Sequence, residues 1–400
     1  MKIKVSMKST LPEVDKSLDV PYYARSFQVT GERTFMTPSR AGTINDYNAK
    51  AWIPNPITMD PDFTVVQKPL NFKKMNDFLT SDVGRNQLVS NVTHNRKKMQ
   101  NSAVTMVYLQ PTQNEYTNKK TKEKVHPGMA YLVGENDRTD EFLDALICLA
   151  HDSGVNAVGF PFLDYLSLEK YKTILTKYAE KSLNIGIEPI FFLDPNPQYE
   201  RIFKLLFDEL LSLSPSDSSK LIGIKYSNPK KSRYALEYLR SHGDKGVPYV
   251  FLNVPRDQTL SLSGIHAEEI IGGDVVSVKQ PTPNIPDDGS APPPPDPFVF
   301  FHDELSVKRL SATMTSPGEL NRYLELINDF EDKKFGMLIE ESLGKQNVEM
   351  ANNVLKVYEF ITSTKESNNS QNFILSQELK SYVTSEKPLI KRWIDSVNHP

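Results

Sequence analysis

Two aspartates stand where apolar segments of the chain end, a position at which carboxylates often do chemistry. Asp164 follows the apolar segment 157–163, and Asp194 follows the apolar segment 185–193. If both segments are parallel strands, their carboxyl ends meet at one edge of a sheet, where ligands collect in α/β proteins. Carboxylates placed there act as general acids, general bases or nucleophiles. Asp164 and Asp194 are therefore candidate catalytic residues.

Other roles for these and nearby acids stay open. Asp194 precedes the Pro-Asn-Pro segment 195–197, which is typical of a turn, and Asp164 is equally placed to cap a helix. Asp274 begins an apolar segment instead of ending one, so we expect it at the opposite end of the fold. Glu188 lies inside an apolar segment and, if it faces inward, needs a partner or a raised pKa.

The elements that must position these residues repeat along the chain. Three short apolar runs at 221–226, 249–254 and 274–279 are separated by intervals of helix length, as in parallel α/β sheets. Counting from Val104 gives six strand–helix units, and one or two earlier strands bring the number to eight. The pattern predicts an α/β fold, a (β/α)8 TIM-like barrel with a helical C-terminal extension. An open doubly wound α/β sheet is the alternative.

Changes in composition divide the chain into three parts. Residues 1–36 form an N-terminal lead-in with a predicted hairpin around Gly31 and Glu32, and residues 37–335 form the barrel domain. A proline-rich insertion at 283–297 interrupts that domain, and residues 336–400 are predicted to be a helical C-terminal extension. After the insertion, apolar spacing predicts helices at 303–312, 317–332 and 346–362.

The composition excludes several classes of protein. The chain has 400 residues, 38% hydrophobic and 24% charged, which is typical of a soluble globular protein. A net charge of −3 argues against a wholly basic nucleic-acid binder. No apolar run reaches the roughly 18 residues of a membrane span, and the first residues lack a signal-peptide core. We therefore expect a cytoplasmic protein that does not bind membranes.

Cysteine and histidine give no sign of a metal site. Cys148 is the single cysteine, so an internal disulfide and a cysteine-rich zinc site are excluded, and its apolar surroundings predict a buried thiol. The seven histidines are scattered, without a pair at helical spacing. The chain also lacks the glycine-rich motifs of dinucleotide- and triphosphate-binding proteins, so no cofactor is expected.

Several segments share a sequence pattern with one enzyme family. Residues 222–229, Ile-Gly-Ile-Lys-Tyr-Ser-Asn-Pro, are in register with a strand of the type Gly-Gly-Leu-Ala-Val-Gly-Glu-Pro. Residues 272–283, Gly-Gly-Asp-Val-Val-Ser-Val-Lys-Gln-Pro-Thr-Pro, align without a gap with Gly-Val-Asp-Met-Phe-Asp-Cys-Val-Leu-Pro-Thr-Arg. Residues 249–254 are similar to a Tyr-Leu-Met-Gly-Val-Gly strand, and Thr37-Pro38 resembles an early Thr-Pro turn. Much of the chain thus resembles the tRNA-guanine transglycosylase superfamily, the queuine and archaeosine tRNA-ribosyltransferases, including their 7-deazaguanine DNA-modifying relatives.

The resemblance implies a (β/α)8 barrel that exchanges a guanine base in nucleic acid for a 7-deazaguanine derivative. It implies backbone contacts from Gly223 and Ile224 to the base, and it gives Asp164 the place of a base-contacting aspartate. Ser277 stands at the position of the family's nucleophilic aspartate. The family's Asp-Ser-Gly-Gly-Phe-Gln motif has no counterpart, and its Cys-x-Cys-x-x-Cys motif is absent, so no structural zinc is expected.

Base exchange at a glycosidic carbon develops positive charge on the sugar, so a carboxylate must lie against that carbon. A second acid or base must manage the proton on the leaving base. In the leading hypothesis Asp164 contacts the base or acts as the acid, and another strand-end acid such as Asp194 replaces the missing nucleophile. Whether Ser277 is a nucleophile or a structural serine stays open.

Two other functions remain as alternatives. One is a non-catalytic barrel that binds nucleic acid or an enzyme partner, and the other is an unrelated TIM-barrel enzyme acting on a small molecule. The expected partners are nucleic acid, either tRNA or DNA, and a 7-deazaguanine base. Lys230, Lys231 and Arg233 follow a predicted strand end, where they either contact phosphates or begin an exposed helix. The oligomeric state stays open.

Overall fold

The structure is a computed structural model of the chain. It describes residues 3–10, 24–50, 61–99, 101–117, 121–134, 136–213, 221–225, 233–254, 264–270, 272–278, 298–329, 333–344, 348–387 and 389–393. The proline-rich segment 283–297 and the basic residues Lys230 and Lys231 lie outside these ranges.

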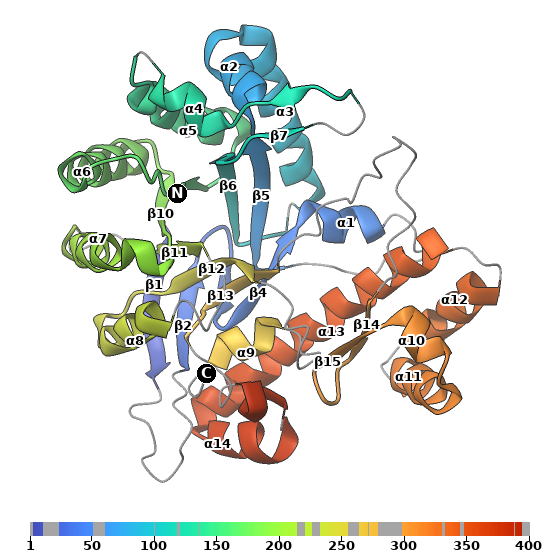
Figure 1. The fold of residues 1–400 in the computed structure, drawn as a ribbon. Coiled ribbons are helices and arrows are strands. Elements are labelled where there is room, and N and C mark those ends of the chain that lie inside the picture. The colour runs from blue at the N-terminus through green and yellow to red at the C-terminus, as the bar shows by residue number, and fades with distance from the viewer. Residues whose placement is uncertain are drawn as a thin grey trace.

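Eight parallel strands close into a barrel at the centre of the molecule (Figure 1). Each strand pairs with the next in chain order, and the last pairs with the first through Val275 and Ser39. The closure confirms the predicted (β/α)8 barrel, and the open doubly wound sheet is wrong. The strands are β4 (Ser39–Thr43), β5 (Phe63–Leu70), β6 (Val104–Pro111), β9 (Ala157–Phe160), β10 (Glu188–Leu193), β11 (Leu221–Lys225), β12 (Tyr249–Val254) and β13 (Val275–Val278).

Amphipathic helices surround the barrel. In α6, Ser167 caps the first turn by accepting a hydrogen bond from the Lys170 amide, and apolar residues at three- and four-residue steps face the strands. The surrounding helices are α1 (Ile44–Lys50), α2 (Phe72–Thr80), α3 (Asp82–Lys98), α4 (Gly128–Val133), α5 (Thr139–Ser153), α6 (Leu168–Asn184), α7 (Glu200–Ser212), α8 (Arg233–Ser241) and α9 (Gly264–Ile270). A short hairpin of β7 (Tyr116–Thr117) and β8 (Lys124–Val125) follows β6.

Cys148 is exposed, so the prediction of a buried thiol is wrong. It lies in α5, where Leu146, Ile147, Leu149 and Ala150 are buried around it. An apolar sequence does not place every side chain inward, because a helix turns successive residues to different sides.

A three-stranded antiparallel sheet covers the amino-terminal end of the barrel. Its strands are β1 (Lys4–Thr10), β2 (Arg25–Thr30) and β3 (Thr34–Met36), and the turn between β2 and β3 confirms the predicted hairpin. Glu32 donates its backbone N–H to the carbonyl of Ala103, directly before β6. Phe27 and Val29 join the apolar cluster that fills the barrel. The amino-terminal end is therefore closed, and a ligand site must lie at the carboxyl-terminal end.

The chain after the barrel strands forms a smaller unit that packs back onto them. It comprises β14 (Phe298–Phe301), β15 (Ser306–Arg309), α10 (Leu310–Met314), α11 (Pro317–Asp329), α12 (Lys333–Gly344), α13 (Val348–Ser376), α14 (Leu379–Ser381) and a π-helical turn (Tyr382–Glu386). The predicted helix at 303–312 is wrong, because β15 pairs with β14 and α10 begins only at Leu310.

Helix α13 links this unit to the barrel. It packs against α1 and β4, and the Arg40 side chain of β4 donates to the carbonyl of Glu359. Near its end, the Gln371 amide donates to the carbonyls of Met36 and Pro38. Part of the C-terminal segment thus belongs to the outer layer of the barrel. Among the described residues, no helix combines the length and apolar character that crossing a membrane requires.

Two aromatic rings fill the interior of the barrel. Tyr108 of β6 and Phe192 of β10 lie with ring centroids 4.7 Å apart. They face two glycines, because a Cβ on Gly159 would lie 2.7 Å from Tyr108 Cδ2 and one on Gly223 would lie 2.4 Å from Phe192 Cδ1. The barrel is a packed core at this level.

The contact between Gly223 and Phe192 leads to a stability prediction. We expect Gly223→Ala to lower the free energy of unfolding by about 1–3 kcal/mol, because the added methyl overpacks the ring. Combining it with Phe192→Leu should recover part of this loss. Urea denaturation of the two variants measures both effects. A Gly223→Ala protein as stable as wild type would contradict the packing described.

Candidate functional site

Polar side chains replace the apolar ones at the carboxyl-terminal end of the barrel. Because side chains alternate along a strand, Asp194 continues the inward series of Ile190 and Phe192, and Lys225 continues that of Leu221 and Gly223. The same alternation brings Gln67, Gln110 and Ser277 to the inner face of β5, β6 and β13. We call these five residues, Asp194, Lys225, Gln67, Gln110 and Ser277, the barrel mouth.

Asp194 forms an ion pair at this mouth. One carboxylate oxygen, Oδ2, lies 3.5 Å from Lys225 Nζ, and the two side chains are 11% and 21% exposed. The other oxygen, Oδ1, accepts a hydrogen bond of 3.0 Å from the backbone N–H of Asn196. The structure thus confirms the turn after Asp194, and the turn leaves one carboxylate oxygen to pair with Lys225. One oxygen shapes the turn, and the other presents negative charge at the mouth.

Asp164 lies past the end of β9, the strand that neighbours β10, and is linked to Tyr199. Its Oδ2 accepts a hydrogen bond of 3.1 Å from the hydroxyl of Tyr199. Burial raises the pKa of Tyr199, and the negative charges of Asp164 and Asp194 raise it further. Asp164 itself is exposed. Asp164 therefore contacts the Tyr199 hydroxyl directly and is open to solvent, whereas Asp194 influences that hydroxyl only through its charge.

The negative charge of Asp194 also contributes to the raised pKa values of two more tyrosines, Tyr108 and Tyr234. Burial raises the pKa of Tyr108, and Asp194 adds to that effect. Burial, with Glu200 and Asp194, also raises the pKa of Tyr234, whose hydroxyl donates to the Asn196 carbonyl at 3.1 Å. The Tyr108 hydroxyl is fully buried and has no hydrogen-bond partner among the described residues. Tyrosines with raised pKa values keep their protons at neutral pH and offer hydrogen-bond donors.

The remaining predicted residues fall in different places. Ser277 is 3% exposed on the inner side of β13, and Gly223 lies in the barrel wall against Phe192. The Ile224 side chain is buried in the core between the strands and helices, facing away from the interior, so only its backbone is left to contact a base. Arg233 begins α8, but its side chain, like Lys230 and Lys231, lies outside what the structure describes.

The other acids lie at the amino-terminal end. Asp274 forms a buried ion pair with Arg25 of β2, at the end opposite the mouth, as its position before β13 predicts. Glu188 is the first residue of β10 and is 2% exposed, so it lies deep below the mouth. Among the described residues, no three His, Cys, Asp or Glu side chains gather closely enough to hold a metal ion.

Sequence reasoning missed Tyr108 and Tyr199. Tyr108 could have been found from alternation, since Val104 and Met106 precede it on the inner side of β6. Tyr199 lies 35 residues from Asp164 in sequence, and only the barrel brings the two together. The resulting site combines two carboxylates, one ammonium group and neutral hydroxyls. This set can stabilise positive charge and move a proton.

The comparisons with known proteins do not assign the chain to a family. No protein-family model matches the chain, and no curated protein matches it. Among solved structures, it is similar to 3-dehydroquinate dehydratase from Geobacillus kaustophilus HTA426, with 7% identity, a TM-score of 0.37, and coverage of 66% of this chain and 90% of that one. A mutant tryptophan synthase α-subunit from Pyrococcus furiosus gives 14% identity and a TM-score of 0.32, over 60% and 85% of the two chains.

Triosephosphate isomerase from Bartonella henselae gives 8% identity and a TM-score of 0.32, over 60% of this chain and 91% of that one. Values this low establish neither family nor activity. The barrel is established by its own strand pairing, and function must be argued from the mouth.

Proposed function

We propose that this protein is a divergent relative of the tRNA-guanine transglycosylases that exchanges a guanine in nucleic acid for a 7-deazaguanine base at the barrel mouth. One observation carries the proposal. Asp164 and Asp194 follow adjacent strands, Asp164 accepts a hydrogen bond from the Tyr199 hydroxyl, and the charge of Asp194 adds a smaller contribution to the raised pKa of that hydroxyl. Base exchange needs two such groups, one for the sugar and one for the proton of the leaving base.

Asp194 has the better position to face the sugar carbon. It is more buried than Asp164 and is held by both the Asn196 amide and Lys225. In the first step the bond from C1′ to guanine N9 breaks, its electron pair leaves with the base, and a carboxylate oxygen of Asp194 bonds to C1′. In the second step N9 of the incoming base attacks C1′, and the bond to Asp194 breaks.

The Asp164–Tyr199 pair handles the proton in this scheme. The leaving guanine takes up one proton, and the incoming base loses one, so the enzyme returns to its starting state. Asp164 is exposed and can exchange protons with solvent, and the Tyr199 hydroxyl, which donates to Asp164 Oδ2, holds that carboxyl in place to pass a proton to the departing base.

The aromatic floor of the mouth suits a base that has left its stack. The rings of Tyr108 and Phe192 fill the interior below Asp194, so a flipped base would lie above them and not against Gly223 itself.

Incorporation of radiolabelled guanine into a tRNA transcript and into duplex DNA tests the proposal. We expect saturable incorporation into one of the two substrates by the folded, full-length protein. Absence of incorporation into both, with nucleic-acid binding intact, would favour the non-catalytic alternative and overturn the proposal.

Ser277 gives a second, more specific prediction. Replacing Ser277 by Ala should leave the rate of exchange within about tenfold of wild type, because Asp194 supplies the carboxylate in this scheme. Single-turnover incorporation rates measure the effect. A loss of several orders of magnitude in a folded Ser277→Ala protein would make Ser277 the nucleophile and remove that role from Asp194.

A further inference from the structure

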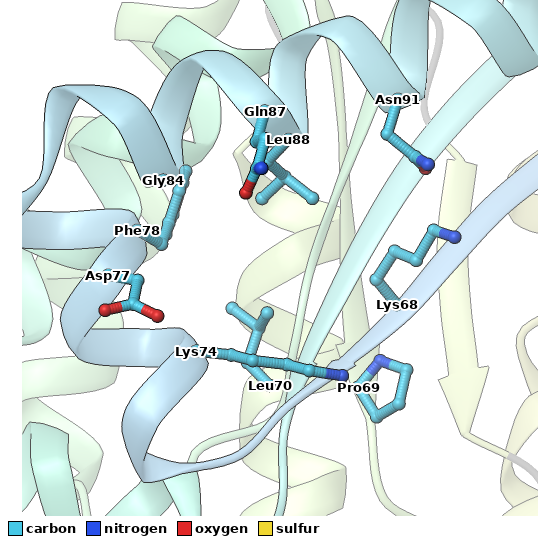
Figure 2. A pocket seen from close by; sticks show the side chains of 10 residues that line it. All are labelled: Lys68, Pro69, Leu70, Lys74, Asp77, Phe78, Gly84, Gln87, Leu88 and Asn91. Carbon is cyan, nitrogen blue, oxygen red and sulfur yellow. The ribbon is translucent and has the colours of Figure 1, made fainter.

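A groove opens beside the barrel mouth, between the end of β5 and helices α2 and α3 (Figure 2). Its volume is about 350 Å³, which is enough for a small ligand or one nucleotide unit. The lining residues are Lys68, Pro69, Leu70, Lys74, Asp77, Phe78, Gly84, Gln87, Leu88 and Asn91. The candidate mouth residues do not include any of these.

Two lysines give the groove a cationic side. Figure 2 shows the ammonium groups of Lys68 and Lys74 on the side formed by β5, with the Asp77 carboxylate across the groove. Neither lysine forms an ion pair with a carboxylate in the part of the chain that the structure describes. Burial lowers the pKa of Lys68, and the neighbouring charge of Lys74 lowers it further. Two like charges held together in this way favour an anion between them.

The other walls of the groove suit a phosphate that carries an organic group. The amides of Gln87 and Asn91 on α3 add hydrogen-bond donors, and Asn91 lies beside the Lys68 ammonium group in Figure 2. Leu70, Phe78 and Leu88 supply apolar surface. A phosphodiester with its sugar matches both kinds of wall, because Lys, Asn and Gln commonly contact phosphate and sugar oxygens.

The position of the groove connects it to the mouth. Lys68 and Gln67 are consecutive residues of β5, so their side chains point to opposite faces of the strand. Gln67 faces the mouth, where its Nε2 donates to Gln110 Oε1 at 3.5 Å, and Lys68 faces the groove. One strand therefore separates the two sites, and a nucleic-acid chain that crosses it can occupy both.

We propose that the Lys68–Lys74 groove binds a backbone phosphate of the nucleic acid whose neighbouring base enters the barrel mouth. That the phosphate belongs to a nucleic acid rests on the proposed function. That the groove binds a phosphate at all is argued only from the residues that line it.

The test compares two double variants that remove the same charge from neighbouring parts of the fold. Lys68→Gln with Lys74→Gln alters the groove, whereas Lys73→Gln with Lys97→Gln alters exposed lysines of α2 and α3 outside it. Affinity of the full chain for a fluorescent tRNA transcript and a 20-base-pair DNA duplex is measured by anisotropy over a series of salt concentrations. We expect the groove variant to bind about tenfold or more weakly. The salt slope should fall by about 1 for each phosphate that the variant no longer neutralises.

The control variant should lose much less affinity. Equal losses in both double variants, or none in the groove variant, would overturn the proposal. Titration with inorganic phosphate and with 5′-GMP forms a second arm. If the groove variant no longer binds these probes but keeps its affinity for both polymers, the site belongs to a free nucleotide and the backbone assignment is overturned.

Failure of the proposed function can be told apart from failure of this inference. If the groove variant loses nucleic-acid affinity and wild type shows no base exchange, the groove proposal holds and the enzymatic proposal fails. If exchange occurs and the groove variant binds both polymers as tightly as wild type, the enzymatic proposal holds and the groove proposal fails.

Discussion

Replacing Asp194 by Asn is expected to reduce the rate of base exchange by about 10⁴- to 10⁶-fold, the range associated with loss of a catalytic nucleophile or of a residue that acts with it. The asparagine carbonyl can still accept the hydrogen bond from the Asn196 amide, so the turn after β10 is retained. What disappears is the negative charge that faces Lys225 and that the proposed scheme places against the sugar carbon. Single-turnover incorporation of labelled guanine measures the loss.

Asp152→Asn is the matched control for this variant. Asp152 is an exposed carboxylate near the end of α5, which leads into the amino-terminal end of β9, and it pairs with the neighbouring His151. Its removal should leave exchange unchanged. Affinity of the Asp194→Asn protein for nucleic acid should stay close to wild type, since phosphate contacts dominate binding. Full exchange activity in Asp194→Asn would remove this residue from the mechanism.

Replacing Arg25 by Ala is expected to lower the free energy of unfolding by about 3–5 kcal/mol near pH 7.5. Arg25 and Asp274 are 0% and 1% exposed, and the guanidinium lies 4.0 Å from the centroid of the Tyr249 ring. It also donates to the carbonyl of Val247 at 3.0 Å. Without it, the Asp274 carboxylate stays buried, and among the described residues the Tyr249 N–H is the donor that it keeps. Urea denaturation measures the loss.

The pH dependence of this loss has a definite sign. Burial raises the pKa of Asp274 to about 6 from its ordinary 3.8, although Arg25 opposes the rise. A raised pKa means that the stability supplied by this carboxyl is full below pH 4 and is lost as the pH rises through 6. Removing Arg25 raises the pKa further, so the difference between wild type and Arg25→Ala should be larger at pH 8 than at pH 5.

A double variant separates the charge from the packing. Arg25→Met with Asp274→Leu removes both charges and should be less destabilised than Arg25→Ala, because no buried charge is left without its partner. A loss for Arg25→Ala that does not change with pH would show that Asp274 keeps one protonation state throughout. That result would contradict the account of this ion pair.

The strands of the barrel could be predicted because each is a short apolar run followed by polar residues. Runs such as 249–254 are read directly from the sequence, and the helices between them carry their own periodicity. The β2–β3 hairpin followed in the same way from Gly31 and its surroundings. The strand pair β14–β15 was missed, because its residues also fit a helical spacing and only pairing distinguishes the two.

The site could be predicted only in part. The position of Asp164 and Asp194 at the carboxyl-terminal end of the barrel could be predicted, because each follows an apolar strand in the sequence. The contact of Tyr199 with Asp164 depends on how adjacent strands align in the barrel, which local patterns do not contain. The ring of Phe192 over Gly223 depends on the same alignment. The groove at Lys68 depends on the packing of α2 against α3, where neither helix alone indicates a cavity.

Release of guanine under single-turnover conditions tests the central claim most directly. The substrate is a tRNA transcript or duplex DNA labelled in its guanine bases, and the full-length protein is in excess. We predict release of labelled guanine that depends on added 7-deazaguanine or unlabelled guanine and is lost in Asp194→Asn. If the nucleic acid binds and no guanine is released from either substrate, the barrel mouth is not a base-exchange site.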